Sequence, residues 1–326
     1  MRADSTAVIG AGRMGRGIAQ TLAFAGLRTT IVDLKRRTDE EFNKLKASAC
    51  SDIETDLRFL ASLGVGTESA VRSIMDLITI APCQHAAVGF GDHQLVFEAV
   101  PETLEAKRAA FAWVSAHANP DAIIASTTST LSVDELAAMV AKPQRFVNAH
   151  WLNPPHLMPL VEIARGTATS QEAVDRLVAV LKAAGKVPVV MTSAPGYVVP
   201  RIQALALSES VRLYAEGVAS AEDIDKAIRI GFGVRFAVLG MLEFIDFGGN
   251  DILYYGVSHL ARTVDEHRFA VPQLAIENMH AGRNGIRDGV GYYDWANIDI
   301  AAYRRERLAK LVDLLRFMDL LPKAAG

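Results

Sequence analysis

The chain has 326 residues, half of them apolar, and a formal net charge of -3. This length is enough for two domains with sizeable cores. The sequence has no basic block, which argues against a nucleic-acid partner, and no long apolar stretch, which argues against a membrane span. Cys50 and Cys83 match no metal or disulfide pattern. The first predicted strand begins within a few residues, so we expect no signal peptide. We therefore expect a cytoplasmic protein without a metal site.

A glycine-rich turn follows the first predicted strand, at residues 6–9. Gly10 allows a tight turn, Gly12 lets the backbone approach a pyrophosphate, and Gly15 lets helix and strand pack closely. A helix predicted over 14–24 then offers its unpaired N–H groups to the phosphates. The pattern predicts a nicotinamide or flavin dinucleotide site. Its turn residues are Gly10, Gly12, Arg13, Met14 and Gly15.

The next predicted strand, at 29–32, ends at Asp33, which suits a hydrogen bond to a ribose 2′-hydroxyl. Because a carboxylate repels a 2′-phosphate, Asp33 favours NAD over NADP as the cofactor. Three basic residues follow closely and favour NADP instead, because they can attract a 2′-phosphate. They are Lys35, Arg36 and Arg37.

The segment after Asp33 has apolar residues spaced by three or four, which predicts a helix that returns through a second helix into a strand near 77–80. The stripe consists of Phe42, Leu45, Ala49, Ile53, Leu57 and Leu60. Later strands are predicted at 95–100, 122–125, 146–150, 160–163 and 187–191. Helices are predicted between them at 102–116, 133–140 and 171–184. This alternation predicts a doubly wound, Rossmann-type α/β sheet with an inserted helical hairpin.

The pattern changes to almost wholly helical after the Pro195–Gly196 step. A capping box of Ser220 and Asp223 precedes a helix predicted over 224–230. We therefore predict an NAD-binding domain over 1–193 and an all-α substrate and dimerisation domain over 194–326. The helical domain is rich in large apolar residues, so part of it is expected to meet a second subunit in a homodimer.

His150 ends a predicted strand, at the edge where α/β sheets place their ligands. A neutral imidazole there can take the proton of a substrate hydroxyl as hydride leaves the same carbon for a nicotinamide. The imidazolium then needs a carboxylate, and the turn between two strands can bring Glu162 alongside. From the residues alone, a packed or surface histidine and a surface ion pair of Glu162 stay open as alternatives.

Motifs along nearly the whole chain together resemble those of the L-3-hydroxyacyl-CoA dehydrogenase family. They are GAGRMGRGIA at 10–19, FEAVPE at 97–102, STTSTL at 126–131, HWLNP at 150–154, LVEI at 160–163, PGY at 195–197 and GVGYYDW at 289–295. The resemblance implies an NAD-dependent dehydrogenase that converts a 3-hydroxyl to a 3-keto group with His150 and Glu162.

The resemblance also implies roles for single residues. Ser129 maps onto a serine that hydrogen-bonds the substrate oxygen, and Asn153 onto an asparagine near the nicotinamide. Glu102 and Lys107 map onto positions near the nicotinamide ribose. The alternatives are a plain loop serine, an asparagine that caps its loop, and an ordinary i,i+5 surface pair.

Two departures from the family pattern concern coenzyme A. Pro200 stands where coenzyme A-using members have an asparagine, and proline cannot donate that hydrogen bond. The stretch 56–63 has an acid and no lysine where those members grip the coenzyme A nucleotide, although Arg58 remains.

A third departure is Arg235, which stands in an apolar run and is similar to the L-gulonate and carnitine dehydrogenase branch, whose substrates are free 3-hydroxy acids. Because burying a guanidinium unpaired is costly, we expect Arg235 to bind a substrate carboxylate, with Glu243 or Asp246 as the alternative partner. The loop 151–156 also resembles a member that oxidises a pyridine carboxylate.

The predicted substrate is thus a short free 3-hydroxy acid, with a short acyl-CoA such as 3-hydroxybutyryl-CoA as the runner-up. A different class is an NAD-binding protein kept for structural use, as the lambda-crystallins are. The joint presence of Ser129, His150 and Glu162 argues against that class, because a structural protein does not need the set.

Overall fold

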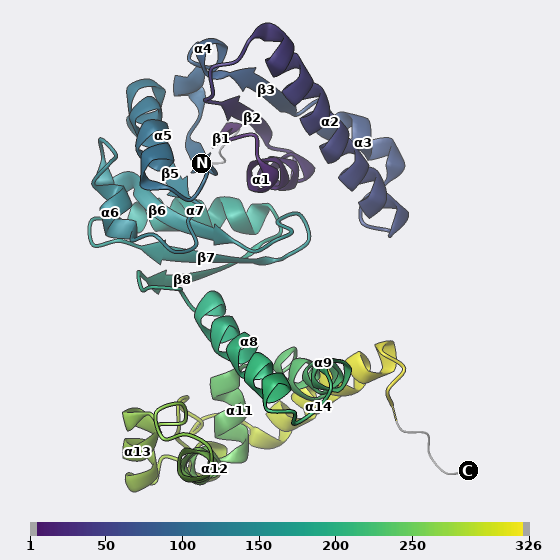
Figure 1. Ribbon diagram of the computed structural model, residues 1–326, viewed down its shortest axis with the longest axis vertical. Helices are drawn as coiled ribbons and strands as arrows, with labels where there is room; N and C mark the ends of the chain where they lie inside the picture. The colour runs from purple at the N-terminus through teal and green to yellow at the C-terminus, as the bar shows by residue number, and fades with distance from the viewer. Residues whose placement is uncertain (1–4, 322–326) are drawn as a thin grey trace. The chain divides into compact units, whose positions relative to one another are not determined.

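The computed structural model describes residues 5–321, and the chain divides into two compact units between Ala206 and Leu207 (Figure 1). The first unit contains the sheet and its helices, and the second is helical. The predicted order, an α/β part followed by an all-α part, is confirmed.

The first unit is built on one eight-stranded sheet with the order β3-β2-β1-β4-β5-β6-β7-β8. All neighbouring strands are parallel except β6 and β7, because the loop 152–159 between them is too short for a parallel crossover. The strands are β1 (Ser5–Ile9), β2 (Arg28–Asp33), β3 (Ile78–Pro82), β4 (Leu95–Glu98), β5 (Ile123–Ser126), β6 (Phe146–Trp151), β7 (Leu160–Arg165) and β8 (Val187–Thr192).

Helices cover both faces of this sheet, as a doubly wound fold requires (Figure 1). One buried cluster joins one face to α1 (Arg13–Phe24), α2 (Asp39–Ser62), α3 (Val71–Met75) and α7 (Gln171–Ala183). A second cluster joins the other face to α4 (Cys83–Ala86), α5 (Leu104–His117) and α6 (Val133–Ala137). The strand ends that carry polar loops therefore lie between two fully packed layers.

The inserted hairpin is formed by α2 and α3, as predicted. Thr38 caps α2: its hydroxyl accepts a hydrogen bond from Glu41 N, and its own N–H donates to Glu41 Oε2 at 2.9 Å. The buried side of α2 consists of Ala49, Ile53, Leu57 and Leu60, which are four of the six residues of the predicted stripe.

Several element ends differ from the prediction by a few residues. The strand β4 stops at Glu98 and α5 begins at Leu104, because Pro101 lies between them and Thr103 caps the helix by accepting from Ala106 N at 3.3 Å. The helix α6 ends at Ala137, earlier than predicted.

The second unit contains α9 to α14, and α8 (Val199–Ala215) crosses into it. Ser220 caps α9, which passes into a π-helical turn at 228–233 where a single helix to 230 was predicted. No helix among residues 5–321 is long and apolar enough to cross a bilayer. The helices are α9 (Ala221–Ala227), α10 (Val234–Phe236), α11 (Met241–Gly248), α12 (Asn250–Thr263), α13 (Gln273–His280) and α14 (Ile300–Phe317).

A buried carboxylate organises the second unit. Asp246 accepts hydrogen bonds from Tyr292 N at 3.0 Å, Tyr293 N at 2.8 Å and Trp295 Nε1 at 2.9 Å. These three donors satisfy a charge that would otherwise be costly to bury. The motif GVGYYDW at 289–295 therefore wraps around Asp246 and has a structural role within this unit.

Candidate active site

The glycine turn after β1 has the geometry of a phosphate-binding loop. Gly10 has a φ of +110°, which side-chain-bearing residues rarely adopt. A Cβ on Gly15 would overlap the carbonyl oxygen of Gly10, so helix and turn pack too closely for any side chain. A Cβ on Gly12 would meet nothing within 4 Å, which leaves the backbone open to a ligand. These residues fit the pyrophosphate of NAD.

A cleft of about 660 Å³ opens beside this turn, a volume typical of small-molecule sites. Of the predicted cofactor residues, it is lined by Gly10, Gly12, Arg13, Met14 and Asp33. Gly15 lies buried behind the turn. The remaining walls are largely apolar and include Leu34, Leu45, Ala99, Val100 and Pro101.

Asp33 lies at the carboxyl end of β2 and is only 5% exposed. Its Oδ2 accepts a hydrogen bond from Arg37 Nε at 2.6 Å, and its Oδ1 accepts a longer one from Lys35 N at 3.4 Å. The carboxylate that suits the ribose is therefore already in contact with a guanidinium. The sequence placed these charges close together without indicating which of them would pair.

His150 and Glu162 are direct partners in the antiparallel register of β6 and β7. Their side chains meet through His150 Nδ1 and Glu162 Oε2 at 2.8 Å, and they are 6% and 1% exposed. The other carboxylate oxygen, Oε1, accepts from Val198 N at 3.0 Å and Val199 N at 2.8 Å. Glu162 thus links the histidine to the start of α8, and within residues 5–321 His150 Nε2 has no hydrogen bond.

Tyr197 is a neighbour of this pair that the sequence reasoning missed. Its ring centre lies 5.3 Å from that of His150, and its side chain is buried. Burial, together with the charges of Glu102 and Glu162, raises the pKa of Tyr197, so the phenol stays neutral. The signal in the sequence was the PGY motif at 195–197, which contains this tyrosine.

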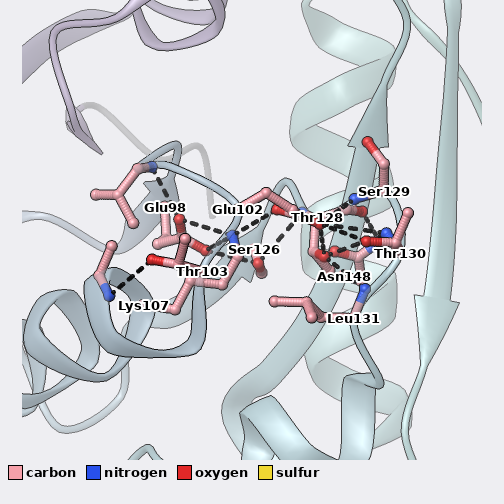
Figure 2. Close-up of polar contacts among 12 residues, drawn as sticks. Glu98, Glu102, Thr103, Lys107, Ser126, Thr128, Ser129, Thr130, Leu131 and Asn148 are labelled. Atoms are coloured by element: carbon pink, nitrogen blue, oxygen red, sulfur yellow. Dashed lines mark hydrogen bonds and ion pairs between the residues drawn. The ribbon is translucent and has the colours of Figure 1, made fainter.

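Glu102 anchors the loop that carries Ser129 (Figure 2). Glu102 Oε1 accepts hydrogen bonds from Ser129 N at 2.9 Å, from Thr130 N at 3.2 Å and from the Thr128 hydroxyl. Partial burial raises the pKa of Glu102, but the hydrogen bond from Thr128 and the charge of Lys107 outweigh it and lower the pKa overall. Ser129 is exposed, and its hydroxyl has no hydrogen bond in the described part of the chain.

Lys107 and Glu98 form a fully buried ion pair beside Glu102 (Figure 2). Lys107 Nζ donates to the two Glu98 oxygens at 3.0 and 2.9 Å and lies 3.2 Å from Glu102 Oε2. The alternative of a surface pair is therefore wrong for Lys107, whose side chain is 0% exposed. Ser126 completes the network by donating to Glu98 Oε2 at 2.6 Å. The sequence reasoning missed Glu98, although an acid inside an apolar strand was a usable signal.

Asn153 lines a second cleft, of about 400 Å³, together with Arg13 and Arg16. The opposite wall is α2, which contributes Asp52 and Asp56. Arg16 is paired with Asp52 across the cleft.

Arg58, the cation that remained on the hairpin, is held by two acids. It donates to Glu54 Oε1 at 2.7 Å and is also paired with Glu68. Its charge is therefore balanced within the hairpin.

Arg235 lies in the second unit and is exposed, so the cost of burial does not demand a partner for it. Its Nε donates to Gly231 O at 2.7 Å, and its guanidinium lies 5.4 Å from the Phe244 ring centre. The alternative that Arg235 pairs with Glu243 or Asp246 is wrong, because within residues 5–321 neither acid forms an ion pair with it. Glu243 binds Tyr303 and Arg307, and Asp246 binds the 292–295 segment.

The parallel strands of the first unit bring most of the predicted site, and Glu98 with it, to one end of the sheet. Gly10 follows β1, Glu98 ends β4, Ser129 follows β5, and His150 lies near the end of β6. These four strands are neighbours in the sheet and parallel, so their carboxyl ends meet. This end of the sheet combines a dinucleotide turn, a buried His–Glu pair and a free serine hydroxyl, which together define a nicotinamide-dependent oxidoreductase.

Comparison with known protein families agrees with this class. Residues 5–194 match the model of the "3-hydroxyacyl-CoA dehydrogenase, NAD binding domain", and residues 196–295 match that of the "3-hydroxyacyl-CoA dehydrogenase, C-terminal domain". The chain belongs to the 3-hydroxyacyl-CoA dehydrogenase family and is an NAD-dependent oxidoreductase that acts on a CH–OH group.

Three relatives illustrate the range of the family. The chain is 31% identical to 5-formyl-3-hydroxy-2-methylpyridine 4-carboxylate 5-dehydrogenase of Mesorhizobium japonicum, over 96% of this chain and 97% of that protein. It is 34% identical to the mitochondrial hydroxyacyl-coenzyme A dehydrogenase of Homo sapiens, over 88% and 90%. A crystal structure of the 3-hydroxyacyl-CoA dehydrogenase from Archaeoglobus fulgidus is 30% identical with a TM-score of 0.76, covering 97% of this chain and 99% of that one.

Proposed function

We propose that the chain oxidises the 3-hydroxyl of a short free 3-hydroxy acid to a 3-keto group, with His150 as the base and Glu162 as its orienting carboxylate. The observation that carries this proposal is the buried pair itself, with 2.8 Å between His150 Nδ1 and Glu162 Oε2. When bound, NAD supplies the acceptor for the hydride that leaves C3.

The hydrogen bond between the two side chains determines which ring nitrogen acts. Because Nδ1–H donates to Glu162, the neutral ring carries its lone pair on Nε2. Nε2 therefore takes the hydroxyl proton as C3 loses a hydride with its electron pair. The resulting imidazolium is stabilised by Glu162 and then releases the proton to solvent.

Ser129 is the proposed hydrogen-bond donor to the substrate oxygen, which gains double-bond character as the carbonyl forms. Its backbone N–H donates to Glu102, which holds the loop that carries the hydroxyl. Glu102 and Asn153 remain proposed contacts of the nicotinamide part. Lys107, being fully buried, acts as a positioning residue through Glu98 and Glu102.

The choice of a free acid rests on the hairpin. Two acids, Asp52 and Asp56, line the cleft beside α2, together with Arg13 and Arg16. Because Arg16 balances Asp52, the carboxylate that stays unfavourable for the phosphates of coenzyme A is that of Asp56. Arg58 is already paired with two glutamates, so it does not offset Asp56. Pro200 lies in the first turn of α8, where a missing N–H is tolerated, and it offers no donor to a substrate.

Arg235 is the proposed contact of the substrate carboxylate. Its Nε is engaged with Gly231 O, which leaves the two Nη groups for a planar, bidentate contact. The similarity to a dehydrogenase named for a pyridine carboxylate supports an acid as substrate.

A second candidate is oxidation of a short L-3-hydroxyacyl-CoA such as 3-hydroxybutyryl-CoA. The specific observation in its favour is the 34% identity to the human hydroxyacyl-coenzyme A dehydrogenase.

A panel of free 3-hydroxy acids and their coenzyme A thioesters, followed by NADH absorbance, separates the two candidates. Arg235→Met should lower kcat/KM for a free acid by roughly 30- to 1000-fold, mainly through substrate binding, and leave thioesters unchanged or improved. The matched control is Arg229→Met, which removes an exposed guanidinium six positions earlier. If the wild type prefers 3-hydroxybutyryl-CoA to every free acid and Arg235→Met changes neither, the second candidate stands.

We also propose the two-domain organisation predicted from the sequence. Residues 1–193 would bind NAD, and residues 194–326 would contact substrate and a second subunit, in a cytoplasmic homodimer. Support for the interface comes from exposed large apolar side chains in the second unit. They include Leu207, Val211, Tyr214, Ile252 and Tyr255.

A further inference from the structure

One end of the NAD cleft carries more positive than negative charge. Asp33, Lys35 and Arg37 all line it there, and Asp33 is the only acid among the described residues that line the cleft. Arg37 Nε lies 2.6 Å from Asp33 Oδ2. The Asp33 side chain is 7% exposed and that of Arg37 is 28% exposed, so the guanidinium covers the acid from the solvent side.

The position of Arg37 is fixed by its surroundings. It is the last residue before Thr38, whose capping box with Glu41 defines the start of α2. Its other anchor is Asp33, at the end of β2. Arg37 is therefore held between a strand end and a helix start, both of which belong to the packed layers of the first unit.

This pairing changes what the cleft can bind. An isolated carboxylate repels the 2′-phosphate of NADP, because like charges in contact are unfavourable. Here the charge of Asp33 is balanced by Arg37, and the Nη groups of Arg37 have no hydrogen bond in the described part of the chain. A guanidinium fork matches phosphate oxygens, and the ammonium of Lys35 adds a second cation.

We propose that Arg37 makes this end of the cleft accept a 2′-phosphate, so that the protein binds NADP as well as NAD and Arg37 sets the ratio between them. The inference rests on the proposed placement of the adenosine ribose beside Asp33. Asp33 Oδ1 keeps only a long contact with Lys35 N, which leaves it for the ribose hydroxyls of NAD. NAD therefore stays preferred, by less than about 100-fold in affinity rather than by the larger factor expected from an unpaired acid.

Adenosine fragments test this proposal without any substrate. The affinities of the full chain for 5′-AMP and adenosine 2′,5′-bisphosphate are measured by titration calorimetry, for the wild type and three variants. Arg37→Gln should weaken the bisphosphate by about tenfold or more and 5′-AMP by less than about threefold. Arg37→Lys keeps the charge but lacks the planar fork of the guanidinium. Its affinity for the bisphosphate should therefore lie between those of the wild type and Arg37→Gln. The matched control is Arg36→Gln, an exposed neighbour outside the cleft lining, which should change neither by more than about twofold.

Two results would overturn the proposal while leaving the cofactor cleft in place. One is an Arg37→Gln protein with an unchanged ratio of the two affinities. The other is a wild type that binds the bisphosphate more than about 100-fold more weakly than 5′-AMP. Failure of both fragments to bind would overturn the placement of the cofactor as well. None of these results depends on which 3-hydroxy compound is oxidised, so they are distinct from a failure of the proposed substrate.

Discussion

Replacing Glu162 with glutamine tests the proposed catalytic pair most directly, because the structure determines how the amide must orient. Val198 N and Val199 N both donate to Oε1 and need an acceptor. The amide oxygen of the variant therefore stays with these two donors, and its NH₂ group points at His150 Nδ1. An NH₂ group there can only donate, so the ring proton moves to Nε2. The nitrogen that should accept the substrate proton is then already protonated.

The expected cost is large. A wrong histidine tautomer in a His–carboxylate pair lowers kcat by about 10³- to 10⁴-fold, which corresponds to roughly 4 to 5.5 kcal/mol in the activation barrier. The fold should survive, because the glutamine keeps its contact with the start of α8. NAD affinity should therefore change by less than about twofold, since Glu162 does not line the cofactor cleft.

The assay is initial-rate NADH formation with the preferred substrate, together with a fluorescence titration of NAD. Glu172→Gln serves as the control, because it removes an exposed glutamate of the same unit. A Glu162→Gln protein that binds NAD normally and keeps more than a tenth of the wild-type kcat would refute the reasoning about the tautomer.

Other predictions address the base, the buried ion pair and the assembly. His150→Ala should lower turnover by roughly 10²- to 10⁴-fold while NAD still binds, and near-normal turnover would rule out the assignment of the base. Lys107→Met should lower the free energy of unfolding by about 3–5 kcal/mol, because it leaves Glu98 charged and buried without its partner. Combining it with Glu98→Gln should recover much of that loss in calorimetry, and a loss below about 1 kcal/mol for the single variant would contradict the account. Light scattering at micromolar concentration should show a dimer, and a monomer alone would count against the proposed interface.

The sequence alone determined the order of elements and the position of the dinucleotide turn. These features depend on local spacing: the glycines at 10, 12 and 15, the stripe of α2, and the alternation of strands and helices. A turn that needs a φ of +110° at Gly10 can be inferred from a short stretch, because its cause lies within that stretch. The candidate pair of His150 and Glu162 came from the turn between their strands together with the family resemblance, because the residues alone left other roles open for both.

The tertiary structure decided how the charged side chains are partnered. Lys107 was expected near the nicotinamide ribose, with a surface pair as the alternative, but α5 packs it against β4, where it pairs with Glu98. Arg37 was one of three basic residues after Asp33, and only the path from β2 to α2 selects it as the partner. Arg235 was expected in a buried run, yet it lies on the surface of its unit. Such pairings join groups from different elements, so burial and direction, which no local pattern contains, determine them.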